Sequence, residues 1–175
     1  MSAYALDFSI DNGAPKIVAT SGVYSEASWS FMPPPDETNL SVLKNRGAKL
    51  IVYHGTSDPV FSSNDTTDWY QRLTTANAGD ASNFARLYTV AGMNHCSGGP
   101  TADQFDMLTP MIAWVEQGKA PDSVTATARD ASNAFPNTEV PSDWGSARSR
   151  PLCPYPKVAR YKSGDINSAT SFACS

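Results

Sequence analysis

Short apolar runs and glycine-containing loops follow one another along the middle of this chain. Residues 48–53 (AKLIVY) form an apolar, β-branched and aromatic run that ends in HGTSDP. Residues 84–90 (FARLYTV) form a second run of this kind, and the loop AGMNHCSGGP follows it. Runs of this length that end at Gly, Asp or Pro are typical of buried strands. The pattern therefore predicts two strands, each of which leads into a loop.

A helix is predicted after the first loop and an irregular segment before the first strand. Within residues 65–76, Trp69 and Leu73 lie four positions apart, and the Ser and Asn residues ahead of them are candidate N-caps. Residues 1–45 contain three consecutive prolines at 33–35 and scattered aromatic residues. Because no helical or strand period persists there, we interpret residues 1–45 as an irregular lead-in segment.

A second helix is predicted after the second loop. Thr101 and Gln104 have the spacing of a capping box. The apolar stripe of this helix comprises Phe105, Leu108, Ile112 and Val115. Because Pro110 removes a backbone hydrogen bond, we expect either a kinked helix or one that begins near Thr109. The order strand, helix, strand, helix within residues 46–125 is typical of the end of a doubly wound parallel sheet. This α/β fold binds ligands at the carboxyl ends of its strands.

The remaining residues, 126–175, are predicted to form a loop-rich tail with many prolines and no repeat. Cys153 and Cys174 lie in this tail, where a disulfide between them would stabilise the fold by about 3 kcal/mol. The third cysteine, Cys96, makes the count odd, so at least one thiol is free or pairs with a cysteine outside the chain. The alternative is three unrelated buried thiols.

Charge and hydropathy exclude two kinds of partner. The chain has 175 residues, a net charge of −4 and no run of Lys or Arg, whereas nucleic-acid binding needs a basic patch. No stretch approaches the roughly 20 apolar residues that cross a membrane, and the amino terminus lacks the features of a signal peptide. We therefore expect a soluble chain, without an export signal of its own, that binds neither nucleic acid nor membrane.

The two histidines, His54 and His95, stand at the mouths of the two predicted loops. His54 directly follows the apolar strand, where its ring is expected to be packed and hydrogen-bonded. His95 lies in a Gly-Met-Asn-His loop and is free to project as a base. Asp58 on the other loop is the natural acid to orient it, and Asp58 precedes His95 as in α/β-hydrolases. Alternatively, Asp58 is only a turn residue with a local hydrogen bond.

The motifs YHGTSDP, GMNHCSGG, WVEQGKAPD and RPLCPYP, with a terminal SFAC, occur in this order and together resemble the tannase and feruloyl esterase family. By this resemblance, His95 is the base, Asp58 is its orienting acid, and Cys96 is half of a disulfide beside the nucleophilic serine. The family carries that serine on an elbow far upstream, before a lid domain that holds a structural calcium ion. No G-x-S-x-G or Gly-Cys-Ser-x-Gly elbow occurs in this sequence.

We therefore expect the carboxyl-terminal part of an α/β-hydrolase, with an acid and a base but no nucleophile, metal or cofactor of its own. The resemblance implies a secreted or periplasmic serine carboxylesterase that cleaves esters of hydroxycinnamic or gallic acids. Its partners would be the small aromatic ester and the upstream half of the same enzyme, and the chain alone would be inactive. Ser97 is a rival nucleophile, although a serine two residues after the base is badly placed for deprotonation.

Two other interpretations stay open at this point. The chain could be a catalytically silent binding or scaffold module descended from such an esterase, because the nucleophile is absent. It could also be an unrelated cytosolic α/β protein, whose tail cysteines would be reduced. A thiol titration under denaturing conditions distinguishes this second alternative.

Overall fold

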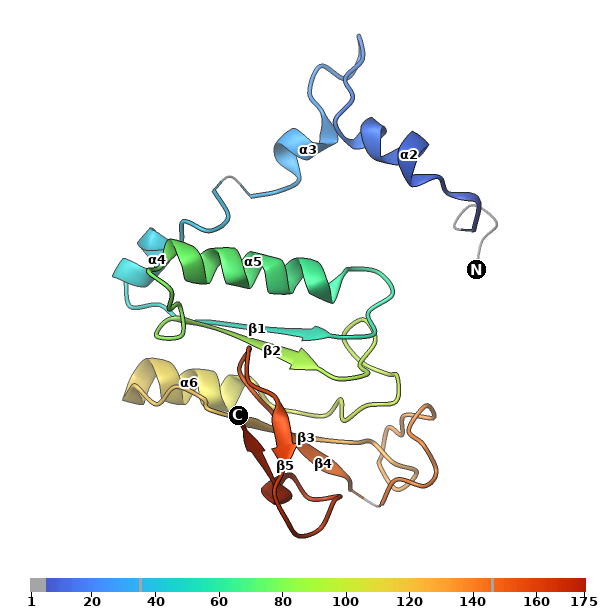
Figure 1. Ribbon diagram of the computed structural model, residues 1–175, viewed down its shortest axis with the longest axis vertical. Helices are drawn as coiled ribbons and strands as arrows, with labels where there is room; N and C mark the ends of the chain where they lie inside the picture. The colour runs from blue at the N-terminus through green and yellow to red at the C-terminus, as the bar shows by residue number, and fades with distance from the viewer. Residues whose placement is uncertain (1–5, 35, 146) are drawn as a thin grey trace. The chain divides into compact units, whose positions relative to one another are not determined.

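The computed structural model describes residues 6–34, 36–145 and 147–175 (Figure 1). Contacts divide the chain into two units, Met1–Glu37 and Thr38–Ser175. The described part of the first unit forms single-turn elements that bury no residue: α2 (Ile10–Gly13), the 3-10 helix η1 (Ala14–Ile17) and α3 (Ser28–Phe31). Residues 1–5 and Pro35, which belong to the predicted lead-in segment, lie outside the described residues.

The second unit is built around two parallel strands, β1 (Leu50–Gly55) and β2 (Ala85–Val90). Their register pairs Leu50 with Ala85 and Gly55 with Val90, so both strands end at the same edge. Helix α5 (Ser63–Ala76) connects the strands, and α6 (Leu108–Gln117) follows β2. Figure 1 shows α5 and α6 on opposite faces of the strand pair. This arrangement confirms the predicted α/β fold.

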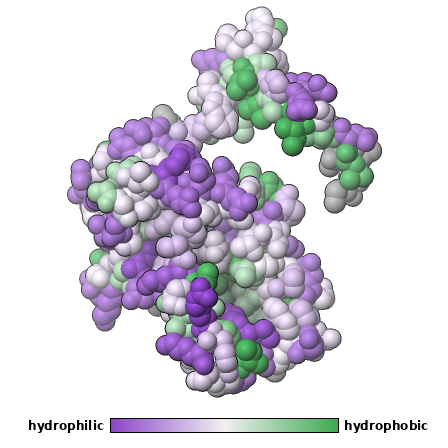
Figure 2. Space-filling model, viewed as in Figure 1, coloured by the Kyte–Doolittle hydropathy of each residue, from purple (hydrophilic) through white to green (hydrophobic). Residues whose placement is uncertain are grey.

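Alternating side chains of β1 and β2 pack toward the two helices, because successive residues of a strand point to opposite faces. The cluster on the α5 face contains Leu50, Val52, Ala85, Leu87, Tyr70 and Leu73. Leu43 of the short helix α4 (Ser41–Asn45) packs against the same cluster. The surface over α5 is mostly hydrophilic in Figure 2, as expected for an amphipathic helix. On the opposite face, the Arg86 guanidinium lies 5.5 Å from the ring centre of Trp114 in α6.

Helix α6 begins at Leu108, so the predicted helix start at Thr101 is wrong. The backbone of Gln104 exchanges two hydrogen bonds with that of Thr127, at 3.1 and 2.9 Å. These bonds hold residue 104 in an extended bridge, which is incompatible with a helical turn. A capping-box spacing is thus overridden by pairing with a segment 23 positions away in the sequence.

The side chain of Asp106 supplies the true start of this helix. Its Oδ1 accepts the backbone N–H groups of Leu108 and Thr109, at 2.7 and 3.1 Å, which have no partner within the first helical turn. Pro110 lies in that same turn, where its missing N–H removes no helical hydrogen bond. The alternative expectation of a helix that begins near Thr109 is therefore confirmed.

The tail forms small antiparallel sheets in addition to loops. Its elements are β3 (Val124–Thr127), β4 (Ser149–Leu152), β5 (Ala159–Tyr161), the 3-10 helix η2 (Ala169–Ser171) and β6 (Phe172–Cys174). β3 pairs with β4, and β5 pairs with β6. The prediction of a loop-rich tail did not include these strands, because they are only three or four residues long. Pro151 lies inside β4, a two-stranded edge where proline is tolerated.

The tail packs against the strand pair and is cross-linked within itself by a disulfide. Val124, Ala126 and Leu152 share a buried cluster with Tyr88 and Val90 of β2. The predicted disulfide between the two tail cysteines is confirmed, and it joins the end of β4 to β6. No helix formed by the described residues is long and apolar enough to cross a membrane.

Candidate active site

Asp58 and His95, the predicted acid and base, are in contact at the edge where β1 and β2 end. Nδ1 of His95 lies 2.8 Å from Oδ2 of Asp58. Asp58 belongs to the loop after β1 and His95 to the loop after β2, and parallel pairing places these loops together. The Asp58 side chain is 5% exposed, whereas that of His95 is 45% exposed. A buried carboxylate thus orients an imidazole that reaches the surface.

Gly55, the last residue of β1, permits this close approach of the two loops. A Cβ atom at this position would overlap the backbone carbonyl oxygens of Met93 and Asn94 in the second loop. The N–H of Ser57 also donates to the carbonyl of Met93, at 3.0 Å, so the backbones of the two loops are directly joined. The glycine after His54 is therefore required by packing between the loops.

The carboxylate of Asp58 is hydrogen-bonded at both oxygens. Oδ1 accepts the N–H groups of Val60 and Phe61, at 2.7 and 3.0 Å, and Oδ2 accepts from His95 and from His54. Burial raises the pKa of Asp58, but the hydrogen bonds from His95, Phe61 and Val60 outweigh it and hold the pKa well below its usual range. The local turn bonds and the bond to His95 therefore coexist, and Asp58 stays ionised at neutral pH.

His54 lies beside the same carboxylate, although its direct role was not expected. Its Nε2 is 3.2 Å from Oδ2 of Asp58, and its Nδ1 is 2.8 Å from Oγ1 of Thr66 in α5. The side chain of His54 is 14% exposed. The expectation of a packed, hydrogen-bonded ring at the end of the strand thus agrees with the structure, and one of its partners is the predicted acid.

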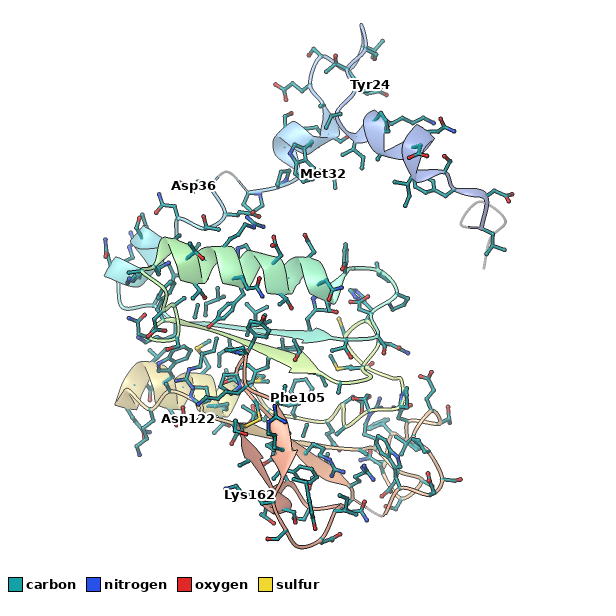
Figure 3. The ribbon with its side chains drawn as sticks, viewed as in Figure 1. Tyr24, Met32, Asp36, Phe105, Asp122 and Lys162 are labelled. Carbon is teal, nitrogen blue, oxygen red and sulfur yellow. A yellow bond between two sulfur atoms is a disulfide. The ribbon has the colours of Figure 1, made fainter. Side chains whose placement is uncertain are left out.

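An open cavity of about 860 Å³ lies over the Asp58–His95 pair. Nε2 of His95, the ring nitrogen that Asp58 does not contact, forms no hydrogen bond with any residue that the structure describes. The ring of Phe61 lies 5.4 Å from the His95 ring and is exposed. Tyr53 also lines the cavity, with its ring edge-on at 5.2 Å to Phe105, which is labelled in Figure 3. His95 therefore shares this cavity with the aromatic side chains of Phe61 and Tyr53.

The His95 loop is braced from behind by charged side chains. Asp103 accepts the N–H of Gly98 at 2.8 Å, and Glu139 of the tail accepts the N–H of Gly99 at 2.7 Å. Arg129 binds both oxygens of Asp103, at 2.9 and 2.5 Å. Burial raises the pKa of Asp103, but its bonds to Arg129 and Gly98 outweigh that effect and lower the pKa. These contacts fix the backbone that presents the imidazole.

The hydroxyl and thiol groups near the imidazole do not bond it. Ser97 is exposed and makes no hydrogen bond to His95, and the same holds for Ser62, which lines the cavity at the N-cap of α5. The Cys96 thiol is free and exposed, on backbone in the left-handed region with φ of 68°. Within the described part of the chain, no group of His, Cys, Asp and Glu side chains could hold a metal ion.

Sequence patterns did not indicate four side chains that hold the pair in place: Thr66, Asp103, Arg129 and Glu139. Thr66 lies 12 positions after its partner His54, and Glu139 lies 40 positions after the glycine that it binds. Asp103 and Arg129 are 26 positions apart and belong to segments without local periodicity. Long-range contacts of this kind leave no spacing signal in a single sequence.

The chain is similar in sequence to known proteins. The family model described as "Tannase and feruloyl esterase" matches residues 31–175. The chain is 48% identical to mono(2-hydroxyethyl) terephthalate hydrolase of Piscinibacter sakaiensis, over 99% of the chain and 27% of that relative. It is 31% identical to feruloyl esterase B of Aspergillus niger, over 79% of the chain and 28% of that relative.

The fold of this chain is also similar to that of a solved structure. The crystal structure of feruloyl esterase B from Aspergillus oryzae matches with a TM-score of 0.63 and 26% identity. The match covers 79% of this chain and 29% of that one. The chain thus spans between a quarter and a third of the length of these relatives.

Proposed function

Because the chain belongs to the tannase and feruloyl esterase family, we propose that it supplies the acid and the base of a carboxylic ester hydrolase. The observation that carries this proposal is the contact between Asp58 and Nδ1 of His95, at 2.8 Å, with Nε2 of His95 unbonded among the described residues and beside the cavity. A base needs this combination of an oriented ring and a free nitrogen.

The proposed reaction is acyl transfer through a serine. Nε2 of His95 takes the proton of the serine hydroxyl while the serine oxygen forms a bond to the ester carbonyl carbon. His95 then gives that proton to the departing alcohol as the ester C–O bond breaks, and the acyl-enzyme is hydrolysed by water in the same two stages. Asp58 stabilises the imidazolium and is not itself protonated, which suits its low pKa.

The nucleophile is proposed to come from outside this chain. Neither Ser97 nor Ser62 is hydrogen-bonded to His95, and the sequence contains no G-x-S-x-G elbow. We further propose that the exposed Cys96 thiol pairs with a cysteine beside that serine, as the family resemblance implies. On this proposal the chain alone does not turn over esters.

The proposed substrates are esters of aromatic carboxylic acids. The names of the two relatives, feruloyl esterase and mono(2-hydroxyethyl) terephthalate hydrolase, both specify an aromatic acid. The exposed Phe61 ring beside His95 offers such an acid a flat apolar surface. The disulfide between Cys153 and Cys174 favours an oxidising compartment, so we propose that the enzyme is secreted or periplasmic.

A chimera tests the proposal. In it, this chain replaces the matching 27% of mono(2-hydroxyethyl) terephthalate hydrolase. We expect the chimera to hydrolyse a feruloyl or terephthaloyl ester, and a fluorophosphonate to label a serine in the part contributed by the relative. The chain alone should show neither turnover nor label. A folded but inactive chimera would contradict the proposal, and a label on Ser97 or Ser62 of the isolated chain would show that the chain carries its own nucleophile.

A further inference from the structure

His54 is a partly buried titratable side chain that the proposed hydrolysis leaves unused. Both of its ring nitrogens are engaged, Nε2 with Oδ2 of Asp58 at 3.2 Å and Nδ1 with Oγ1 of Thr66 at 2.8 Å. His95 has one ring nitrogen bonded and one unbonded among the described residues. His54 therefore has no nitrogen with which to take a proton from a nucleophile, but it does touch the acid that serves His95.

The chemistry of an ionised carboxylate decides the direction of these hydrogen bonds. A carboxylate accepts and cannot donate, so Nε2 of His54 and Nδ1 of His95 both donate to the same oxygen of Asp58. A neutral His54 that carries its proton on Nε2 has an unprotonated Nδ1. That nitrogen accepts the hydroxyl hydrogen of Thr66. The bonds thus form one directed chain, from Thr66 through His54 to Asp58.

Thr66 is turned away from its own helix to make this bond. In α5 the hydroxyl groups of Thr67, Thr74 and Thr75 each donate to a carbonyl oxygen four residues back, at 2.8 to 3.0 Å. The hydroxyl of Thr66 instead lies against the ring of His54. The side chain of Thr66 therefore acts across the strand–helix packing, and it selects the His54 tautomer that can donate to Asp58.

Two bonded oxygens fix the plane of a carboxylate that one bonded oxygen would leave free to turn. The torsion about the Cβ–Cγ bond of Asp is broad. Backbone N–H groups hold Oδ1 of Asp58, at 2.7 and 3.0 Å, and the two histidines hold Oδ2. Without His54, only His95, whose side chain is 45% exposed, would bind Oδ2. The Asp58 oxygen that orients His95 would then be held in place by His95 alone.

We propose that His54 is a positioning residue for the acid–base pair, which fixes Oδ2 of Asp58 through Nε2–H and shares its negative charge with His95. This inference rests on the proposed function. A second donor on Oδ2 leaves less negative charge to stabilise the His95 imidazolium.

Other ionisable groups around the pair do not provide this effect. Asp65 and Cys96 line the same cavity from α5 and from the His95 loop. No Lys or Arg side chain is among the residues that line it. His54 is thus the one side chain besides His95 that donates to Asp58 within the described part of the chain.

Nitrogen NMR of the chain tests the tautomer without any substitution. We expect the Nδ1 resonance of His54 to be that of an unprotonated ring nitrogen at neutral pH, and the Nε2 resonance that of a protonated one. The opposite tautomer would place a lone pair against the Asp58 carboxylate and would overturn the proposal. Because this result does not depend on ester hydrolysis, it is separate from the test of the proposed function.

Substitution of His54 tests the effect on the base. In His54→Leu, the midpoint for protonation of His95 should rise, whereas in His54→Gln, whose amide can still donate to Asp58, it should stay near that of the unchanged chain. A purely structural role would leave the midpoint in place, so an unchanged or lowered midpoint in His54→Leu would overturn the proposal.

The chimera provides the kinetic counterpart. His54→Leu should lower kcat/KM by about 100-fold, the loss expected when a catalytic group is displaced by about 1 Å. The acid limb of its pH–rate profile should move to higher pH, and His54→Gln should recover most of the rate. Equal losses in the two variants, or an unmoved acid limb, would overturn the positioning role.

Discussion

Replacing Arg129 with Met should strip a buried carboxylate of its counter-ion and lower the free energy of unfolding by about 3–5 kcal/mol. The Asp103 side chain is 0% exposed and that of Arg129 is 22% exposed. Arg129 binds both oxygens of Asp103, at 2.9 and 2.5 Å. The remaining bond to Asp103, from the N–H of Gly98, brings no positive charge. Because Met retains the apolar stem of Arg, the loss reflects charge more than volume.

Urea denaturation of the chain measures this loss as a lower midpoint with an unchanged slope. Arg160→Met is the matched control, because Arg160 is an exposed residue of β5 without an ion pair in the described part of the chain, and such substitutions change stability by about 0.5 kcal/mol or less. In the double variant Arg129→Met with Asp103→Asn, the buried charge is absent and part of the stability should return. If Arg129→Met lost no more stability than Arg160→Met, the Asp103–Arg129 pair could not be what braces the His95 loop.

Three further predictions concern the same framework. Gly55→Ala should prevent the loops of Asp58 and His95 from packing together, because its Cβ would overlap backbone oxygens, and an unchanged thermal midpoint would refute this. Replacing both Cys153 and Cys174 with Ser should cost about 3 kcal/mol in urea denaturation; an unaltered midpoint would count against a stabilising disulfide. Asp58 and Asp103 have pKa values below their ordinary value of about 3.9 in the folded chain. Their contribution to stability is therefore complete above about pH 4 and is lost as the pH falls through the depressed pKa values. A urea midpoint that rises on acidification below pH 4 would contradict that sign.

The two parallel strands, and the contact between the loops that follow them, were predictable from the sequence. The runs AKLIVY and FARLYTV correspond to β1 and β2, because apolar, β-branched strands between turn residues leave a strong pattern. Parallel strands end at one edge, so Asp58 and His95, placed just after those strands, could be expected to meet. Their contact depends on topology more than on side-chain detail.

Contacts that join distant segments could not be predicted. Gln104 pairs with Thr127, and this pairing prevents a helix from starting at Thr101, so α6 begins at Leu108. The short tail strands gain their order from the cluster with β2 and from the disulfide, not from their own periodicity. His54 and Asp58 are only four positions apart. This strand residue and this loop residue nevertheless meet only because the chain turns at Thr56 and Ser57, directly after β1.

Ester hydrolysis by the chimera, measured after substitution of His95 or Asp58, tests the proposed roles of these two residues as base and acid. His95→Ala should abolish turnover, and Asp58→Asn should lower kcat by about 10⁴, because the imidazole then adopts the wrong tautomer. Asp68→Asn is the matched control, because Asp68 is an exposed carboxylate of α5 that is not among the residues lining the cavity. Turnover should be lost in the first two variants and stay near normal in the third. Near-normal turnover in either His95→Ala or Asp58→Asn, with the fold intact, would contradict these roles.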